Sequence, residues 1–173
     1  MRRSLVSRRS AASTVEAAIV FPIAFFLIFA IVVGALGIFR YHQVCYLARE
    51  ATRYASTHGG QYQQENSAKI SAGTYPNVDE AYIKSNIIAA NSSNLDSDSL
   101  TTTIKINKSS GSYNWDDTDK NGNRMPTSSK TVDGTTYTDT NTVSVTITYT
   151  WMPEMYLIGP ITMTSTSVMP MCY

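Results

Sequence analysis

The chain has 173 residues and a formal net charge of +1. This length allows one modest domain beside a membrane segment, and the near-neutral charge by itself points to no class of partner. The sequence has no phosphate-binding glycine loop and no stretch that combines basic with aromatic residues, so nucleotide or nucleic-acid binding is not expected.

The N-terminal segment combines a basic cluster with a single acid. Glu16 is the only acidic residue before an uncharged apolar run at 17–39, and the arginines that precede it are Arg2, Arg3, Arg8 and Arg9. Beside a membrane span such a cluster sets topology, and the positive-inside rule places this end in the cytoplasm. We therefore expect a single-pass protein of the cell (inner) membrane whose C-terminal domain is extracytoplasmic.

Residues 17–39 are predicted to form a transmembrane helix. As a helix they would measure about 34 Å, which matches a hydrocarbon core of about 30 Å. The run is longer than the roughly 7–15 residues of a cleaved secretory signal. Pro22, near its start, permits a kink. A carboxylate deep in such a helix costs roughly 2.5–3.5 kcal/mol on insertion scales, so we expect Glu16 to have a function.

Helical periodicity continues beyond the apolar run. Apolar side chains recur at steps of three and four residues after Arg40, which predicts an amphipathic extension of the helix over residues 40–58. Gly59 and Gly60 would terminate it. The predicted packing face consists of Val44, Leu47, Ala48, Ala51, Tyr54 and Ala55.

Two segments resemble a known family. Arg8-Arg9-Ser10-Ala11-Ala12-Ser13-Thr14-Val15-Glu16 resembles a type IV prepilin, with a basic leader, small residues at the cleavage point and a Glu at the fifth mature position. Ala48-Arg49-Glu50-Ala51-Thr52-Arg53-Tyr54-Ala55 is similar to the segment that follows the membrane helix in TadE-like minor pseudopilins of the tight-adherence (Flp, type IV-like) pilus system. The family usually has Gly where Ala11 stands and a bulky residue where Ala17 stands.

The resemblance implies a role and the residues that perform it. Prepilin peptidase would cut between Ala11 and Ala12, and Glu16 would pair with the new N-terminal amine of a neighbouring subunit during assembly. The implied partners are the lipid bilayer, the peptidase, other pilin or pseudopilin subunits and the pilus assembly platform. The corresponding divisions of the chain are a leader at 1–11, a transmembrane helix at 12–39, a helix extension at 40–58 and a head domain at 59–173.

The first part of the head is predicted to contain a loop and a second helix. Residues 61–75 are polar and turn-rich, which predicts a loop. Asn77, with Glu80 three residues later, has the spacing of a helix N-terminus, and residues 91–94 would end that helix. Its predicted packing face consists of Val78, Ala81, Tyr82, Ser85 and Ile88.

The second part of the head is predicted to form strands. Apolar residues alternate there with Ser, Thr and Lys, which is typical of half-buried strands in a mainly antiparallel sheet. The predicted strands are 100–106, 143–151 and 161–168. A long helix, a second helix and a small sheet together predict an α+β fold.

An acidic segment offers a candidate calcium site. Its possible oxygen ligands recur at alternate positions before and after Gly122, as at the start of a calcium-binding loop. The residues are Asp117, Asp119, Asn121 and Asn123. The closing Glu of such a loop is absent, since Ser128 occupies its position, and an ordinary solvated turn is the alternative because Asp, Asn and Gly all favour turns.

Cys45 and Cys172 are both predicted to lie outside the membrane, where a disulfide between them could persist. Two separate thiols are the alternative.

No set of residues indicates catalysis, since His42 and His58 are not spaced as a metal pair and lie in no recognised motif, so we do not expect an enzyme. The rival to a pilin-like subunit is an uncleaved, membrane-anchored domain that binds an external ligand, with calcium as a candidate cofactor.

Overall fold

The computed structural model describes residues 6–92, 95–108, 111–117, 129–132, 135–138, 141–153 and 159–172. The side chains of residues 6–12 and 61, and those of the two short strands at 129–132 and 135–138, are not described. Within these ranges the fold is a long N-terminal helix, further short helices and a small antiparallel sheet, which confirms the predicted α+β class.

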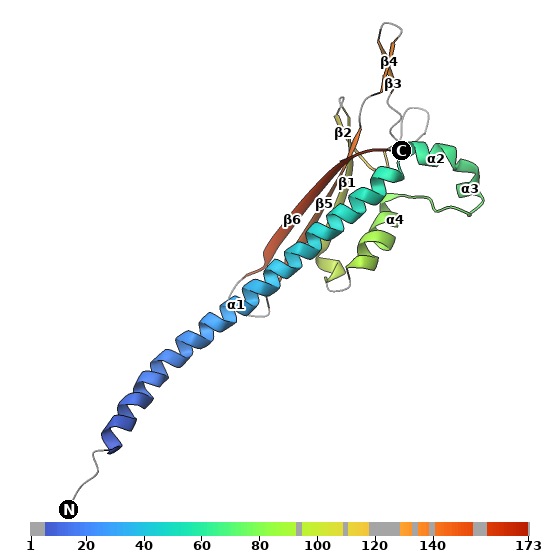
Figure 1. The fold of residues 1–173 in the computed structure, drawn as a ribbon. Coiled ribbons are helices and arrows are strands. Elements are labelled where there is room, and N and C mark those ends of the chain that lie inside the picture. The colour runs from blue at the N-terminus through green and yellow to red at the C-terminus, as the bar shows by residue number, and fades with distance from the viewer. Residues whose placement is uncertain are drawn as a thin grey trace, which may run out of the picture.

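The long helix α1 (Val6–Thr57) has two halves with opposite surroundings. Large apolar side chains are exposed along its first half, including Phe21 at 71%. The second half supplies the centre of the core with Val44, Leu47, Ala48, Ala51 and Ala55. The first half projects away from the head in Figure 1, whereas the second half lies against the sheet. The predicted amphipathic extension is confirmed, and the helix runs without a break through Pro22.

Two short helices follow α1 where a loop was predicted. They are α2 (Gly60–Glu65) and α3 (Ser67–Ser71), so the prediction of a loop was wrong for most of residues 61–71 and is confirmed for residues 72–75. Their mainly polar sequence has no apolar period to indicate a helix. Aromatic contacts join the segment to the end of α1, because the ring of Tyr62 lies edge-on to His58 with centroids 4.6 Å apart.

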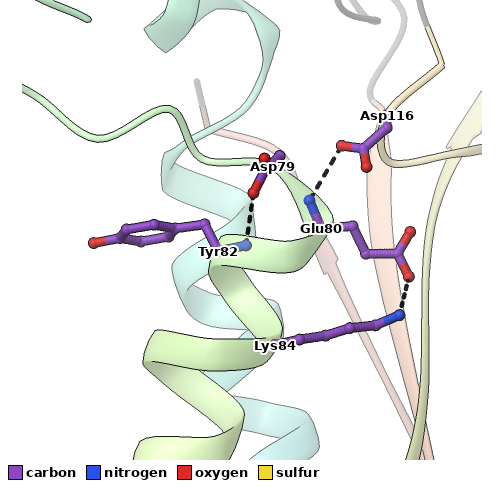
Figure 2. A network of polar contacts seen from close by, with 5 residues as sticks. All are labelled: Asp79, Glu80, Tyr82, Lys84 and Asp116. Carbon is purple, nitrogen blue, oxygen red and sulfur yellow. Dashed lines mark hydrogen bonds and ion pairs between the residues drawn. The ribbon is translucent and has the colours of Figure 1, made fainter. Parts of the chain in front are cut away.

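The second helix begins later than predicted and contains a π-helical part. It consists of α4 (Glu80–Tyr82) followed by a π-helix, η1 (Ile83–Ala89). Its N-cap is Asp79 rather than Asn77, because the Asp79 carboxylate accepts a 2.6 Å hydrogen bond from the backbone N–H of Tyr82 (Figure 2).

The π-helix also changes which residues pack. Val78 and Ile88 are buried as predicted, but Ala81 and Ser85 are exposed, and Ile83 is buried instead. A π-helix bonds residues five apart, which brings Ile83 and Ile88 towards the same face. A prediction made with the ordinary helical period therefore selected two wrong positions.

The main sheet contains four antiparallel strands in the order β2-β1-β5-β6. They are β1 (Leu100–Lys108), β2 (Gly111–Asn114), β5 (Thr142–Trp151) and β6 (Ile161–Pro170). A short 3-10 turn, η2 (Ser97–Ser99), precedes β1, and β3 (Ser129–Val132) pairs with β4 (Thr135–Thr138) in a separate hairpin. The predicted alternation is confirmed, since the inward side chains of β1 and β5 are buried: Thr102, Ile104, Ile106, Val143, Val145, Ile147, Tyr149 and Trp151.

Helix α1 packs on the sheet and covers the edge strand β6. The buried Thr52 hydroxyl donates a hydrogen bond to the carbonyl of Ala48 and lies 3.4 Å from the carbonyl of Ser167 in β6. The backbone N–H of Cys172 donates a 2.9 Å bond to the carbonyl of Ser56. An uncovered strand edge is a template for pairing with other chains, and α1 lies against this edge strand at Ser167.

Candidate assembly and membrane-anchoring site

The residues of the predicted processing site lie near the start of α1. The backbone is helical through Ala11 and Ala12. Glu16 follows one turn later with an exposed side chain, beside a shallow hollow lined by Ser13, Ala17, Val20 and Phe21. Among the residues whose side chains are described, no cation forms an ion pair with Glu16. An exposed carboxylate at the start of an apolar surface can attract a positive partner outside the subunit.

The apolar half of α1 meets the requirements for crossing a membrane. By length and composition, the segment Ser13–Thr57 contains a window sufficient to span a bilayer, and that window is not buried by the head. Phenylalanines line a shallow apolar hollow on this half, where the ring centroids of Phe25 and Phe29 lie 4.8 Å apart. This surface needs lipid or other apolar helices around it, because exposing so many aromatic side chains to water is unfavourable.

A tight contact joins the end of the apolar run to the sheet. The ring of Trp151 lies so close to Gly37 that a Cβ there would be 2.8 Å from a ring carbon. Arg40 places its guanidinium 5.7 Å from the centre of the same ring and donates a 3.2 Å hydrogen bond to the hydroxyl of Tyr149. Trp151 is 3% exposed, and its indole N–H has no acceptor among the described residues. Sequence reasoning missed this junction, although a glycine in an apolar helix indicates close approach of another group.

The other end of α1 carries a row of aromatic rings. Tyr54 stacks on His58 with centroids 4.1 Å apart, and Tyr82 lies 6.3 Å from Tyr54. Burial raises the pKa of the Tyr54 phenol to about 12, and hydrogen bonding with Tyr82 adds to the effect. These contacts join α1 to α4, so the row has a structural role in holding the second helix on the first.

Only the start of the predicted calcium loop lies within the described residues. An Asp117 carboxylate oxygen accepts a 2.8 Å hydrogen bond from the backbone N–H of Asn114 and closes the turn after β2. Asp119, Asn121 and Asn123 lie outside the described residues. Within the described part of the chain, no group of three or more His, Cys, Asp or Glu residues is arranged to hold a metal ion.

The neighbouring acid, Asp116, caps the second helix. Its carboxylate accepts a 3.1 Å bond from the backbone N–H of Glu80, as Figure 2 shows. The side chain of Glu80 forms a 2.8 Å ion pair with Lys84 one turn later. Asp79 and Asp116 together therefore satisfy two N–H groups at the helix start, where negative charge is favourable.

The predicted disulfide is not formed in this structure. Cys45 and Cys172 are free thiols, the first half-buried and the second exposed. The backbone of Cys172 is bonded to Ser56, which lies about 16 Å beyond Cys45 along the helix axis at 1.5 Å per residue. A disulfide requires Cα atoms within about 7 Å, so the attachment of the C-terminal tail holds the two residues apart.

Comparison with known proteins shows that the segment around α1 is similar to one protein family. The family model described as TadE-like protein matches residues 11–53. No curated protein and no solved structure matches the chain. The match begins at Ala11 and ends at Arg53, so it contains Glu16, the apolar run and most of the segment after it. The resemblance to TadE-like proteins of the tight-adherence pilus system is confirmed over these residues.

Proposed function

We propose that this protein is a pilin-like, TadE-like structural subunit that takes part in assembling a tight-adherence pilus or a related secretion apparatus. The match of the family model to residues 11–53 carries the proposal. The two halves of α1 support it, because one half is packed by its own head and the other offers an apolar surface that needs neighbours. A subunit of this shape can reside in the bilayer and then pack its free half-helix against those of other subunits.

In this proposal, prepilin peptidase cleaves between Ala11 and Ala12 and creates a new α-amino group. Glu16 then forms an ion pair with that amine on an adjacent subunit. Two opposite charges attract strongly in a low-dielectric medium, and each alone is costly there, so the pair fixes the axial position of one helix against the next. The exposure of Glu16 supports this role, because its carboxylate is accessible to another subunit.

The mature N-terminus tests the processing step. Mass spectrometry of the protein extracted from membranes of a host with the peptidase should detect a chain that starts at Ala12. Ala11→Leu should block cleavage, because the position is expected to accept only small residues, whereas Ala11→Gly should be processed at least as well as wild type. An intact leader on the wild-type chain in that host would favour the rival, a membrane-anchored ligand-binding domain.

Removing the charge of Glu16 tests the assembly step. Glu16→Gln keeps the size of the side chain and removes its charge, so membrane insertion should be retained and piliation lost. Glu50→Gln is the matched control, because Glu50 lies on the same helix within the head and should leave piliation intact. Normal piliation with Glu16→Gln would refute the ion-pair role.

A further inference from the structure

The ends of β5 and β6 lie at the level where the apolar run of α1 stops. In Figure 1 the lower end of the sheet meets α1 near its middle. Trp151, the last residue of β5, packs on Gly37, which precedes Phe39 by two residues or about 3 Å of helix axis. In the sheet register Trp151 is the partner of Ile161, so the start of β6 shares this level. A bilayer around residues 17–39 would therefore reach the end of the sheet.

Exposed apolar side chains surround this level on both the head and the helix. Met152 is 61% exposed, Phe39 55% and Ile161 37%. Arg40 and Trp151 lie among them, with Tyr149 bonded to Arg40. An Arg side chain is typical of a membrane–water interface, because it combines an apolar stem with a charged group. Tyr149 and Trp151 are buried, and they hold Arg40 in place from within the head.

We propose that this end of the head is a lipid-contacting surface that rests on the outer leaflet of the bilayer spanned by α1. This basal surface consists of Phe39, Arg40, Met152 and Ile161, and the buried Trp151 lies directly beneath it. Its apolar side chains enter the interfacial layer of the bilayer. A hollow of about 510 Å³, lined by Arg40 together with Asp96 and Met152 among others, opens beside it.

Continuity with the membrane helix favours lipid over a second copy of the chain as the occupant. The basal surface begins where the apolar run ends, so a bilayer that reaches Gly37 reaches the level of Trp151 and of its exposed neighbours Met152 and Ile161. A second copy would have to displace lipid from the same level. The inference rests on the membrane anchoring included in the proposed function, and it does not depend on processing or on pilus assembly.

Fluorescence in lipid nanodiscs that contain one chain each tests the proposal. An environment-sensitive fluorophore is attached to Met152→Cys in the full chain, with Cys45→Ser and Cys172→Ser removing the natural thiols. The matched control is Ser112→Cys on β2, at the opposite end of the sheet and also exposed. The label at 152 should show blue-shifted emission and be quenched by lipids that carry a nitroxide near the headgroup. The label at 112 should show emission typical of water and no quenching.

A second pair of variants separates a basal contact from a general association with lipid. Ile161→Asp should reduce the quenching at 152, because a charge at that level is unfavourable in the interfacial layer. Thr164→Asp, on the exposed face of the same strand, should leave quenching unchanged. If the chain enters the discs but the label at 152 is unquenched, the basal surface does not contact lipid and the anchoring itself is unaffected. A blue shift at 152 that is absent with one chain per disc and appears only in discs loaded with two chains would identify a second copy as the occupant and overturn the proposal.

Discussion

The contact between Gly37 and Trp151 predicts opposite behaviour for two neighbouring glycines of α1. A Cβ at Gly37 would lie 2.8 Å from a carbon of the Trp151 ring, whereas a Cβ at Gly34 has no atom within 4 Å. Gly37→Ala should therefore displace a buried indole, and Gly34→Ala should fit without change. The two variants add the same methyl group to the same helix, so their difference isolates the contact with Trp151.

The size of the difference follows from two effects. Replacing Gly by Ala favours a helix by at most about 1 kcal/mol, and this gain is common to both variants. Overpacking a well-packed site costs about 1–3 kcal/mol, and only Gly37→Ala incurs it. The midpoint of that overpacking cost is about 2 kcal/mol. The Tm of a protein of this size falls by about 2–4 °C for each kcal/mol, so the Tm of Gly37→Ala should be about 4–8 °C lower than that of Gly34→Ala.

Thermal unfolding of the head in full-length protein in detergent micelles, followed by near-ultraviolet circular dichroism, measures this difference. Trp151→Phe provides a double-mutant cycle, because the smaller ring leaves room for the added methyl group. In that background Gly37→Ala and Gly34→Ala should have the same effect. Equal Tm values for the two alanine variants in the wild-type background would refute the reasoning.

Three further predictions concern the head. Asp79→Ala should lower the free energy of unfolding by about 1 kcal/mol in urea titrations, because the Tyr82 N–H loses its cap, whereas Asn77→Ala should have a smaller effect. Thr52→Val should destabilise the head by about 0.5–1.5 kcal/mol in the same assay by removing a buried hydroxyl bonded to the Ala48 carbonyl, and an unchanged urea midpoint would contradict its role. The raised pKa of Tyr54 means that folding favours the neutral phenol, so its contribution to stability is complete below pH 10 and is lost as the pH rises to about 12. Urea unfolding at pH 9 and pH 11.5 should therefore show a smaller alkaline loss for Tyr54→Phe than for wild type.

Local sequence patterns were sufficient to predict the main elements. The apolar run and the three- and four-residue steps after it predicted one helix continuing into the head, and α1 ends at Thr57, just before Gly59. Alternation predicted the buried faces of β1 and β5. Residues 161–168 were predicted as a last strand, and they form most of β6. These patterns are reliable because each face of a helix or strand has one environment along its length, and that environment selects the residue types. The TadE-like segment was also recognisable from sequence, since its residues are contiguous.

The tertiary structure decided what depends on contacts between distant residues. The π-helical turns placed Ile83 rather than Ala81 in the core, which an ordinary helical period cannot anticipate. The attachment of the C-terminal tail to Ser56 separates Cys172 from Cys45, although both lie in the same predicted compartment. The position of Trp151 on Gly37 depends on how the sheet docks on α1. Such contacts join residues far apart in the chain, so no local periodicity records them, and only the packed fold brings them together.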